Sequence, residues 1–199
     1  MHQSIIITSL IDFLSLLRAF TVYDKENTVS PGRTEMMEYT LEPISINDRE
    51  PVIDIFNYYV ENSFAAYPET KVPYESFDTL LKMSDGYPTV AARDNRGRIM
   101  GFGMLRVHNP MPTFSQVAEI TYFIGPEHTG KGIGTSILEY LIEEAKKKNI
   151  TSILASISSR NERSMAFHEK NGFRECGRFQ NIGRKNGEVF DVVWMQKML

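Results

Sequence analysis

The sequence predicts one α/β domain, of the α+β type with a mixed sheet, over residues 37–199, preceded by an N-terminal extension over residues 1–36. Three patterns predict this class. A glycine-rich turn at 125–135 joins a strand-like apolar run to an amphipathic helix pattern. Two strand patterns flank a turn at 94–97, and two more flank a turn at 185–187, as in antiparallel hairpins. The expected element order is β-α-α-β-β-β-α-β-α-β-β.

The composition fits a domain with an ordinary core. The chain has 199 residues, 42% of them hydrophobic, and a formal net charge of −3, which argues against a general nucleic-acid binder. Cys176 is the only cysteine, so an intrachain disulfide is excluded, and this fits a reducing compartment. We therefore expect a cytoplasmic protein with no nucleic-acid partner.

The extension begins with an apolar helical stripe over residues 1–20. Asp12 and Arg18 interrupt this stripe, and it is too short for a membrane span of about 20 apolar residues. No Lys or Arg precedes it, so it makes a poor signal peptide. We expect a helix that packs on the domain or on a partner chain, then a polar linker at 21–34, and no stable membrane association.

The first half of the domain carries alternating and helical apolar patterns. The expected elements are a strand at 39–46, a helix capped by Asn47, an irregular loop at 62–72, a short helix at 73–83 that begins with Pro73, and strands at 87–93, 98–107 and 116–124.

The second half contains the clearest helix pattern of the chain. One apolar face follows the glycines, formed by Ile133, Ile137, Leu138, Leu141, Ile142 and Ala145. We then expect a buried strand at 152–157, a helix capped by Asn161 and stopped by Gly172, and strands at 173–182 and 189–196.

The glycine-rich turn is an expected anion site, because a helix N-terminus offers unpaired N–H groups and a positive dipole end. Two phosphate motifs fit it incompletely. Gly125–Lys131 matches the first seven positions of a phosphate-binding P-loop, but Gly132 stands where that motif needs a hydroxyl. The glycines at 130, 132 and 134 are one residue short of the dinucleotide fingerprint. An ordinary glycine-rich connection is a further alternative.

A third motif fits better. Thr129–Gly134 resembles the acyl-CoA loop of the GNAT superfamily of N-acetyltransferases, Gln/Arg-x-x-Gly-x-Gly/Ala, at both glycines, and departs from it at Thr129. About thirty residues later, Asn161–Phe173 resembles the second signature of that superfamily, N-x-x-A-x-x-F-Y-x-K-x-G-F, with His168 in place of the usual Tyr. Two motifs in the right order identify the chain, from about residue 38 to the end, as a likeness of the GNAT fold.

A narrower resemblance concerns the strand before the loop and the C-terminal hairpin. Glu119–Ile124, His168 and the segment 183–196 are similar to the phosphinothricin and methionine sulfoximine N-acetyltransferase subgroup. This resemblance implies that the protein acetylates the α-amino group of glutamine-like amino acids. It also implies a homodimer, in which the last strands, and possibly the N-terminal helix, form the interface.

Acetyl transfer requires an acceptor for the amine proton and a donor near the leaving thiolate. We expect Glu119 to be the base, because it lies in an apolar strand and burial favours the neutral form of a carboxyl group. We expect His168 to be the acid or a second base, because it stands at the position of the superfamily Tyr. The alternatives are a solvent-facing strand Glu and a helix-surface His.

The resemblance also assigns the binding of acetyl-CoA, which needs no metal; the chain shows no His/Cys cluster that would bind one. Backbone groups of Tyr122, Phe123 and Ile124 are expected to pair with the pantetheine arm. The pyrophosphate is expected at the loop residues Thr129, Gly130, Lys131, Gly132, Ile133, Gly134 and Thr135. Asn161 either only caps its helix or also contacts CoA.

The acceptor pocket is defined less well. The subgroup places an Arg and an aromatic residue before the Glu strand, and these positions fall on Met111 and Phe114. Arg106 or His108 are the expected substitutes for the missing Arg. The aromatic segment from Phe64 to Tyr67 is expected to wall the pocket, or simply to pack on the first helix.

We therefore predict an acetyl-CoA-dependent N-acetyltransferase that acts on a small-molecule amine, probably an amino acid. The alternatives are an acetyltransferase for protein N-termini or lysines, and a CoA-binding regulatory domain without turnover. A P-loop nucleotidase is the remaining one.

Overall fold

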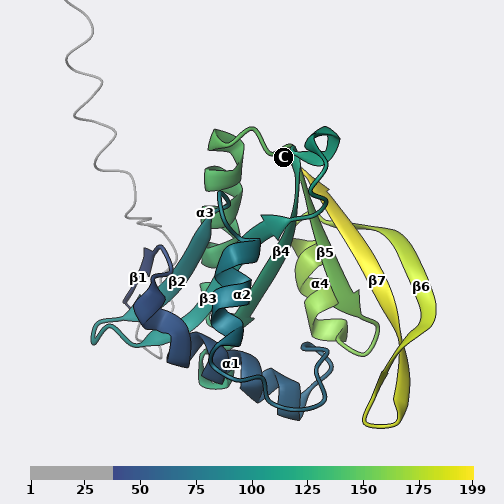
Figure 1. Cartoon of the computed structure of the whole chain (residues 1–199), viewed down its shortest axis with the longest axis horizontal. Helices are drawn as coiled ribbons and strands as arrows, with labels where there is room; N and C mark the ends of the chain where they lie inside the picture. Colours follow the sequence, from purple (N-terminus) through teal and green to yellow (C-terminus); the bar gives the residue numbers. More distant parts are fainter. Residues whose placement is uncertain (1–37) are drawn as a thin grey trace, which may run out of the picture. The chain divides into compact units, whose positions relative to one another are not determined.

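The computed structural model describes residues 38–199, and the extension predicted for residues 1–36 lies outside the described part. Figure 1 shows a central sheet with helices packed on it and a long C-terminal hairpin at one side. No helix among the described residues is long and apolar enough to cross a membrane.

The predicted order of elements is confirmed. The strands are β1 (Tyr39–Glu42), β2 (Thr89–Asp94), β3 (Ile99–Val107), β4 (Val117–Ile124), β5 (Ser152–Ser158), β6 (Arg174–Lys185) and β7 (Glu188–Met198). The helices are α1 (Arg49–Asn62), α2 (Ser76–Met83), α3 (Ile133–Lys147) and α4 (Glu162–Lys170). The seven strands form one sheet in the order β1-β2-β3-β4-β5-β7-β6, and only β4 and β5 are parallel.

The two faces of the sheet carry separate cores. Helices α1 and α2 cover one face, where Phe77 and Phe102 are fully buried. Helices α3 and α4 cover the other face, where Ile137 and Leu141 lie in the core. A Cβ atom on Gly103 would lie 2.5 Å from Ile137 Cγ2, so this glycine in β3 allows α3 to approach the sheet closely.

The start of the domain differs from the prediction. Strand β1 ends at Glu42, and a 3-10 turn at Ile46–Asp48 precedes α1. The prediction that Asn47 caps this helix is wrong. Asp48 occupies the cap position, and its Oδ2 accepts a hydrogen bond from Ser45 N at 2.7 Å. A reciprocal Ser–acid pair satisfies the turn here, and sequence spacing alone did not distinguish it from a simple cap.

The other boundaries agree to within a few residues. Helix α2 begins at Ser76, whose N–H donates to Pro73 O at 3.0 Å, so Pro73 opens the turn that leads into the helix. Asn161 caps α4 as predicted, since its side chain accepts from Ser164 N at 3.2 Å. The last hairpin turns at Asn186 and Gly187, both with positive φ, as in a tight two-residue turn.

Candidate active site

The site lies where β4 and β5 separate. The two strands pair only through Val117–Glu119 on β4 and Ser152–Leu154 on β5. Beyond Glu119, β4 keeps its pairing with β3, and β5 keeps its pairing with β7. The facing edges of the two strands therefore have no ladder partner, and a cavity of about 690 Å³ includes residues from both.

The glycine-rich turn forms one end of this cavity. Gly132 has φ of +85° and is the residue before α3, and Gly130 has φ of +77°. No atom lies within 4 Å of the position where a Cβ would stand on either glycine. A ligand can therefore approach the backbone closely, next to the N–H groups and the positive dipole end of a helix N-terminus. These features suit a pyrophosphate group.

Most residues predicted to bind the cofactor line this one cavity. They are Tyr122, Phe123, Ile124, Thr129, Gly130, Gly132, Gly134, Thr135 and Asn161. Two predicted residues do not line it, Lys131 and Ile133. The Ile133 side chain is buried in the core under α3, so only its backbone could serve a ligand.

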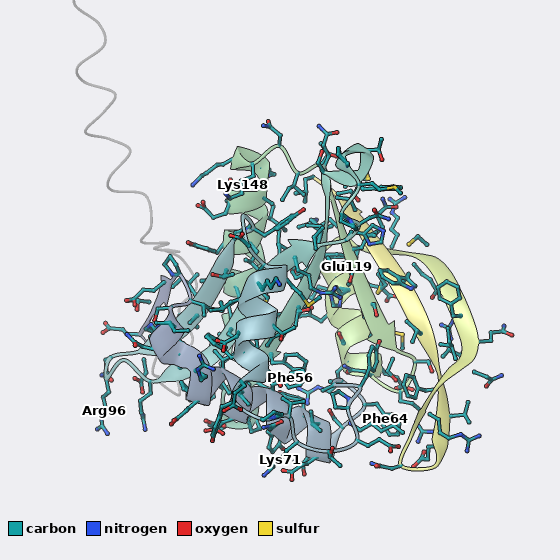
Figure 2. The ribbon with its side chains drawn as sticks, viewed as in Figure 1. Phe56, Phe64, Lys71, Arg96, Glu119 and Lys148 are labelled. Carbon is teal, nitrogen blue, oxygen red and sulfur yellow. The ribbon has the colours of Figure 1, made fainter. Side chains whose placement is uncertain are left out.

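Glu119 lies at the point where the strands separate, near the centre of the molecule in Figure 2. Its side chain is buried, and its carboxylate is in contact with Arg106 and His108. His108 Nδ1 lies 2.8 Å from Glu119 Oε1. Because an ionised carboxylate only accepts, His108 donates from Nδ1. The alternative of a solvent-facing Glu is therefore wrong.

This arrangement also locates the expected substitutes for the missing Arg. Arg106 and His108 both converge on Glu119, and Arg106 lines the cavity. Met111, at the position where the subgroup resemblance places an Arg, is 62% exposed. The positive charges at this end of the cavity therefore come from strand β3 and the residue that follows it.

His168 on α4 is 3% exposed, so the alternative of a helix-surface His is wrong. Its Nδ1 lies 2.7 Å from Ser164 O, and its Nε2 lies 2.8 Å from the Tyr122 hydroxyl. A carbonyl oxygen only accepts, so Nδ1 carries the proton and Nε2 accepts from Tyr122. The two side chains, from α4 and β4, both line the cavity.

Burial determines the charge of this pair. Desolvation lowers the pKa of His168, and the hydrogen bond to the Ser164 carbonyl acts against this shift. Desolvation also raises the pKa of Tyr122, with a smaller opposing effect from Ser164. Both groups are therefore neutral at pH 7, with the Tyr122 proton directed to His168.

The aromatic residues predicted for the acceptor pocket separate into two groups. Tyr67 lines the cavity, and its hydroxyl lies 3.2 Å from Ser156 Oγ, across from β5. Phe64 instead packs edge-to-face against Phe190 of β7, with ring centroids 5.7 Å apart, beside the hairpin in Figure 2. Phe114 contacts the His108 ring, with centroids 6.3 Å apart, and does not line the cavity.

Sequence reasoning missed several polar residues of the cavity. They are Ser156 and Ser158 on β5, Arg163, Ser164 and Lys170 on α4, and Tyr59 on α1. Serines at alternate positions of an apolar strand are a signal that could have identified the first two. Tyr59 was assigned to an apolar helix face, yet its hydroxyl donates to Ile124 O at 2.6 Å.

No group of three or more His, Cys, Asp or Glu residues within 38–199 is arranged to hold a metal ion. The polar groups of the cavity are backbone amides, hydroxyls, the Tyr122–His168 pair, and cationic side chains that include Arg106. This set suits a phosphate-bearing ligand at one end and proton transfer at the other.

Comparison with known proteins agrees with this geometry. The family model described as Acetyltransferase (GNAT) family matches residues 52–173. An L-methionine sulfoximine/L-methionine sulfone acetyltransferase of Pseudomonas aeruginosa is 29% identical over 80% of this chain and 94% of its own length. This match to the family decides between the alternatives for the glycine-rich turn, so the P-loop and dinucleotide interpretations are set aside.

Two solved structures share the fold. A GNAT superfamily phosphinothricin acetyltransferase from Sinorhizobium meliloti, in complex with AcCoA, has a TM-score of 0.77 and 27% identity, over 82% of this chain and 89% of its own. A ribosomal-protein-alanine N-acetyltransferase from Brucella melitensis has a TM-score of 0.75 and 31% identity, over 80% and 99%. Both resemblances predicted from the sequence are confirmed, and the chain belongs to the acetyltransferase (GNAT) family.

Proposed function

We propose that this protein transfers the acetyl group of acetyl-CoA to the primary amine of a small molecule, an amino acid of the phosphinothricin or methionine sulfoximine type. The observation that carries the proposal is the position of Glu119. It stands where β4 and β5 separate, between the carboxylate partners Arg106 and His108, and the cavity extends from this region to the glycine-rich turn. The names of the relatives support the acceptor class.

The residues that line the cavity fit acetyl-CoA as the co-substrate, which supplies a thioester for attack by the amine. The amides around Gly130, Gly132 and Gly134 would hold its pyrophosphate. The free edge of β4 over residues 120–124 would pair with its pantetheine arm, and the Ile124 carbonyl already accepts from Tyr59. Asn161 lines the cavity while its side chain caps α4.

We propose Glu119 as the base that accepts the amine proton, directly or through one water. A carboxylate has about four lone-pair sites, so the bonds from Arg106 and His108 leave acceptor capacity for the proton. The two partners fix the orientation of the carboxylate. Because Arg106 lines the cavity and Glu119 does not, Arg106 covers the carboxylate on the cavity side.

We propose His168 as the proton source for the departing thiolate, acting through Tyr122. When Nε2 carries a proton, the Tyr122 oxygen accepts that proton and the hydroxyl gives its own to sulfur. Burial lowers the pKa of His168, so the protonated ring is a stronger acid than an exposed imidazole. The 2.8 Å contact between Nε2 and the Tyr122 hydroxyl supports this route.

A protein N-terminus is the second candidate acceptor. The structure of the ribosomal-protein-alanine N-acetyltransferase is the observation that favours it, at 31% identity. A small-molecule enzyme and a peptide enzyme differ in acceptor, while the cofactor end of the site is the same for both. Lysine acetylation and CoA binding without turnover are tested by the same experiment.

The test is a screen with thiol detection over amino acids, polyamines and short peptides, at fixed acetyl-CoA. We expect CoA thiol to appear fastest with methionine sulfoximine or phosphinothricin, with one N-acetyl product formed per thiol. Turnover only with peptides would replace the small-molecule proposal by the N-terminal or lysine alternative. Binding of acetyl-CoA without thiol release for any amine would support a regulatory domain.

A homodimer and a cytoplasmic location remain predictions. Phe179 and Ile182 on β6 are 54% and 61% exposed, which supports an interface at the last hairpin. Light scattering on the full chain and on a chain that starts at Met37 tests the assembly. A dimer in both places the interface in the domain, a dimer of the full chain alone assigns it to the extension, and a monomer in both contradicts the prediction.

A further inference from the structure

Lys185, the last residue of β6, is a buried lysine far in sequence from the cavity. Its side chain is 1% exposed. Its Nζ donates three hydrogen bonds, to the backbone carbonyls of Val60, Ser63 and Ala66, each at 2.7 Å. All three acceptors belong to the end of α1 and the segment that follows it.

The chemistry of the ammonium group fits this position. A lysine ammonium has three donors, and all three are used here. Helix α1 ends at Asn62, so the Val60 carbonyl is one of the last four that have no partner within a helix. A cation at a helix C-terminus is also favoured by the helix dipole. Lys185 therefore satisfies backbone groups that would otherwise lack donors at a buried chain end.

Other contacts join the same two regions. Asn186 N donates to Glu69 Oε1 at 2.7 Å, and Phe64 packs against Phe190. The tip of the β6–β7 hairpin thus holds segment 60–69 at several points. This segment supplies Ser63, Ala65, Ala66, Tyr67 and Pro68 to the wall of the cavity.

We propose that Lys185 is a positioning residue that fixes segment 63–68, and with it Tyr67, as the wall of the acceptor end of the active site. This role rests on the proposed function, because it concerns recognition of the amine. Lys185 has no contact with the glycine-rich turn, so its effect is confined to the acceptor. The wall is preorganised by the hairpin, and the segment does not need to be ordered by the substrate.

The test compares Lys185→Met with Lys197→Met. Lys197 lies on the same hairpin, away from its tip, and its Nζ donates to a single backbone carbonyl, Asn171 O, at 2.8 Å. We expect Lys185→Met to raise KM for the amine about tenfold, with the Kd for acetyl-CoA within about twofold of wild type. Lys197→Met is expected to change neither. Lys185→Arg is expected to behave like Lys185→Met, because a planar guanidinium does not match three converging carbonyls.

A second readout does not need the acceptor to be known. Cleavage by chymotrypsin after Phe64 reports opening of the segment, and we expect it about tenfold faster in Lys185→Met than in Lys197→Met. Unchanged cleavage and unchanged KM in Lys185→Met would overturn the proposal. Faster cleavage without any amine turnover in wild type would leave the positioning of the segment supported and refute the proposed function instead.

Loss of folding in Lys185→Met is met by a milder variant. Glu69→Ala removes the bond from Asn186 N at the exposed side of the same contact, without leaving a buried charge. We expect faster cleavage after Phe64 and a higher KM for the amine, both changes smaller than about tenfold. Wild-type values of both in Glu69→Ala, together with a folded and unchanged Lys185→Arg, would contradict the proposal.

Discussion

The two ends of the cavity are built in different ways. At the cofactor end, the ligand would meet backbone groups: the glycine-rich turn, the start of α3 and the free edge of β4. At the acceptor end, side chains from distant segments converge, as Arg106 and His108 do on Glu119. A backbone site is encoded by a short continuous stretch, whereas a side-chain site depends on how the whole chain folds.

The largest expected effect concerns the acceptor end. We predict that Glu119→Gln lowers turnover by about 10²-fold or more, the range for a positioned general base. The Kd for acetyl-CoA is expected to stay within about twofold of wild type, because the carboxylate has no role at the glycine-rich turn. Steady-state kinetics and equilibrium binding measure the two quantities separately.

Circular dichroism provides the control for this variant, since Glu119 holds two cationic partners. A folded Glu119→Gln with wild-type turnover would remove Glu119 from the reaction. A parallel loss of acetyl-CoA binding would show that the two ends of the cavity are not independent.

The second prediction concerns the cofactor end. Gly132→Val should weaken acetyl-CoA binding by about tenfold or more, because a branched side chain would occupy the space through which a phosphate approaches the backbone. Gly97→Val is the matched control. Gly97 has φ of +76° and equally open surroundings, but lies in the β2–β3 turn.

Both substitutions place a side chain in the left-handed region, at a cost of about 1–2 kcal/mol. Their thermal stabilities are therefore expected to fall by similar amounts, and only Gly132→Val should lose affinity in calorimetric titration with acetyl-CoA. Equal affinity of the two variants would place the pyrophosphate elsewhere.

The third prediction concerns His168 and Tyr122. His168→Phe should lower turnover about tenfold, and His168→Tyr should recover part of the loss, because a hydroxyl returns at that position. Tyr122→Phe should cost about as much as His168→Phe, and the double variant should lose less than the product of both losses, because the two groups share one proton route. Wild-type turnover in His168→Phe would leave His168 with a packing role only.

The smallest effect is a pH dependence of stability. Desolvation lowers the pKa of His168 in the folded chain below its ordinary value of 6.5, so below about pH 6.5 the unfolded chain binds a proton that the folded chain does not. The free energy of unfolding should therefore fall as the pH drops from 7.5 to 5.5, more in wild type than in His168→Phe. Urea unfolding at both pH values measures the difference. Identical losses would mean that His168 titrates normally.

These differences explain how much the sequence could predict. The order of all strands and helices was predictable, because apolar periodicity and glycine turns are local signals. Nine of the cofactor residues were found for the same reason. Asn47 was assigned wrongly, because a Ser45–Asp48 pair depends on the conformation of the turn.

The acceptor end was predictable only in part. Arg106 and His108 were named as candidates for a substrate carboxylate, yet both contact Glu119, a fact set by the register of β3 against β4. The role of Lys185 had no local signal, since its acceptors lie at least 119 residues away in the sequence. The burial of His168 followed from packing between α4 and the sheet, although its position in the motif was recognised.

The most direct test of the proposed function is a competition between acceptors. Equal concentrations of methionine sulfoximine and of a short peptide with an N-terminal alanine are incubated with the protein and limiting acetyl-CoA, and the products are quantified by mass spectrometry. The proposed function predicts that N-acetyl methionine sulfoximine takes up nearly all of the acetyl groups, and that Glu119→Gln forms almost none. Acetylation of the peptide in excess over the amino acid would contradict it.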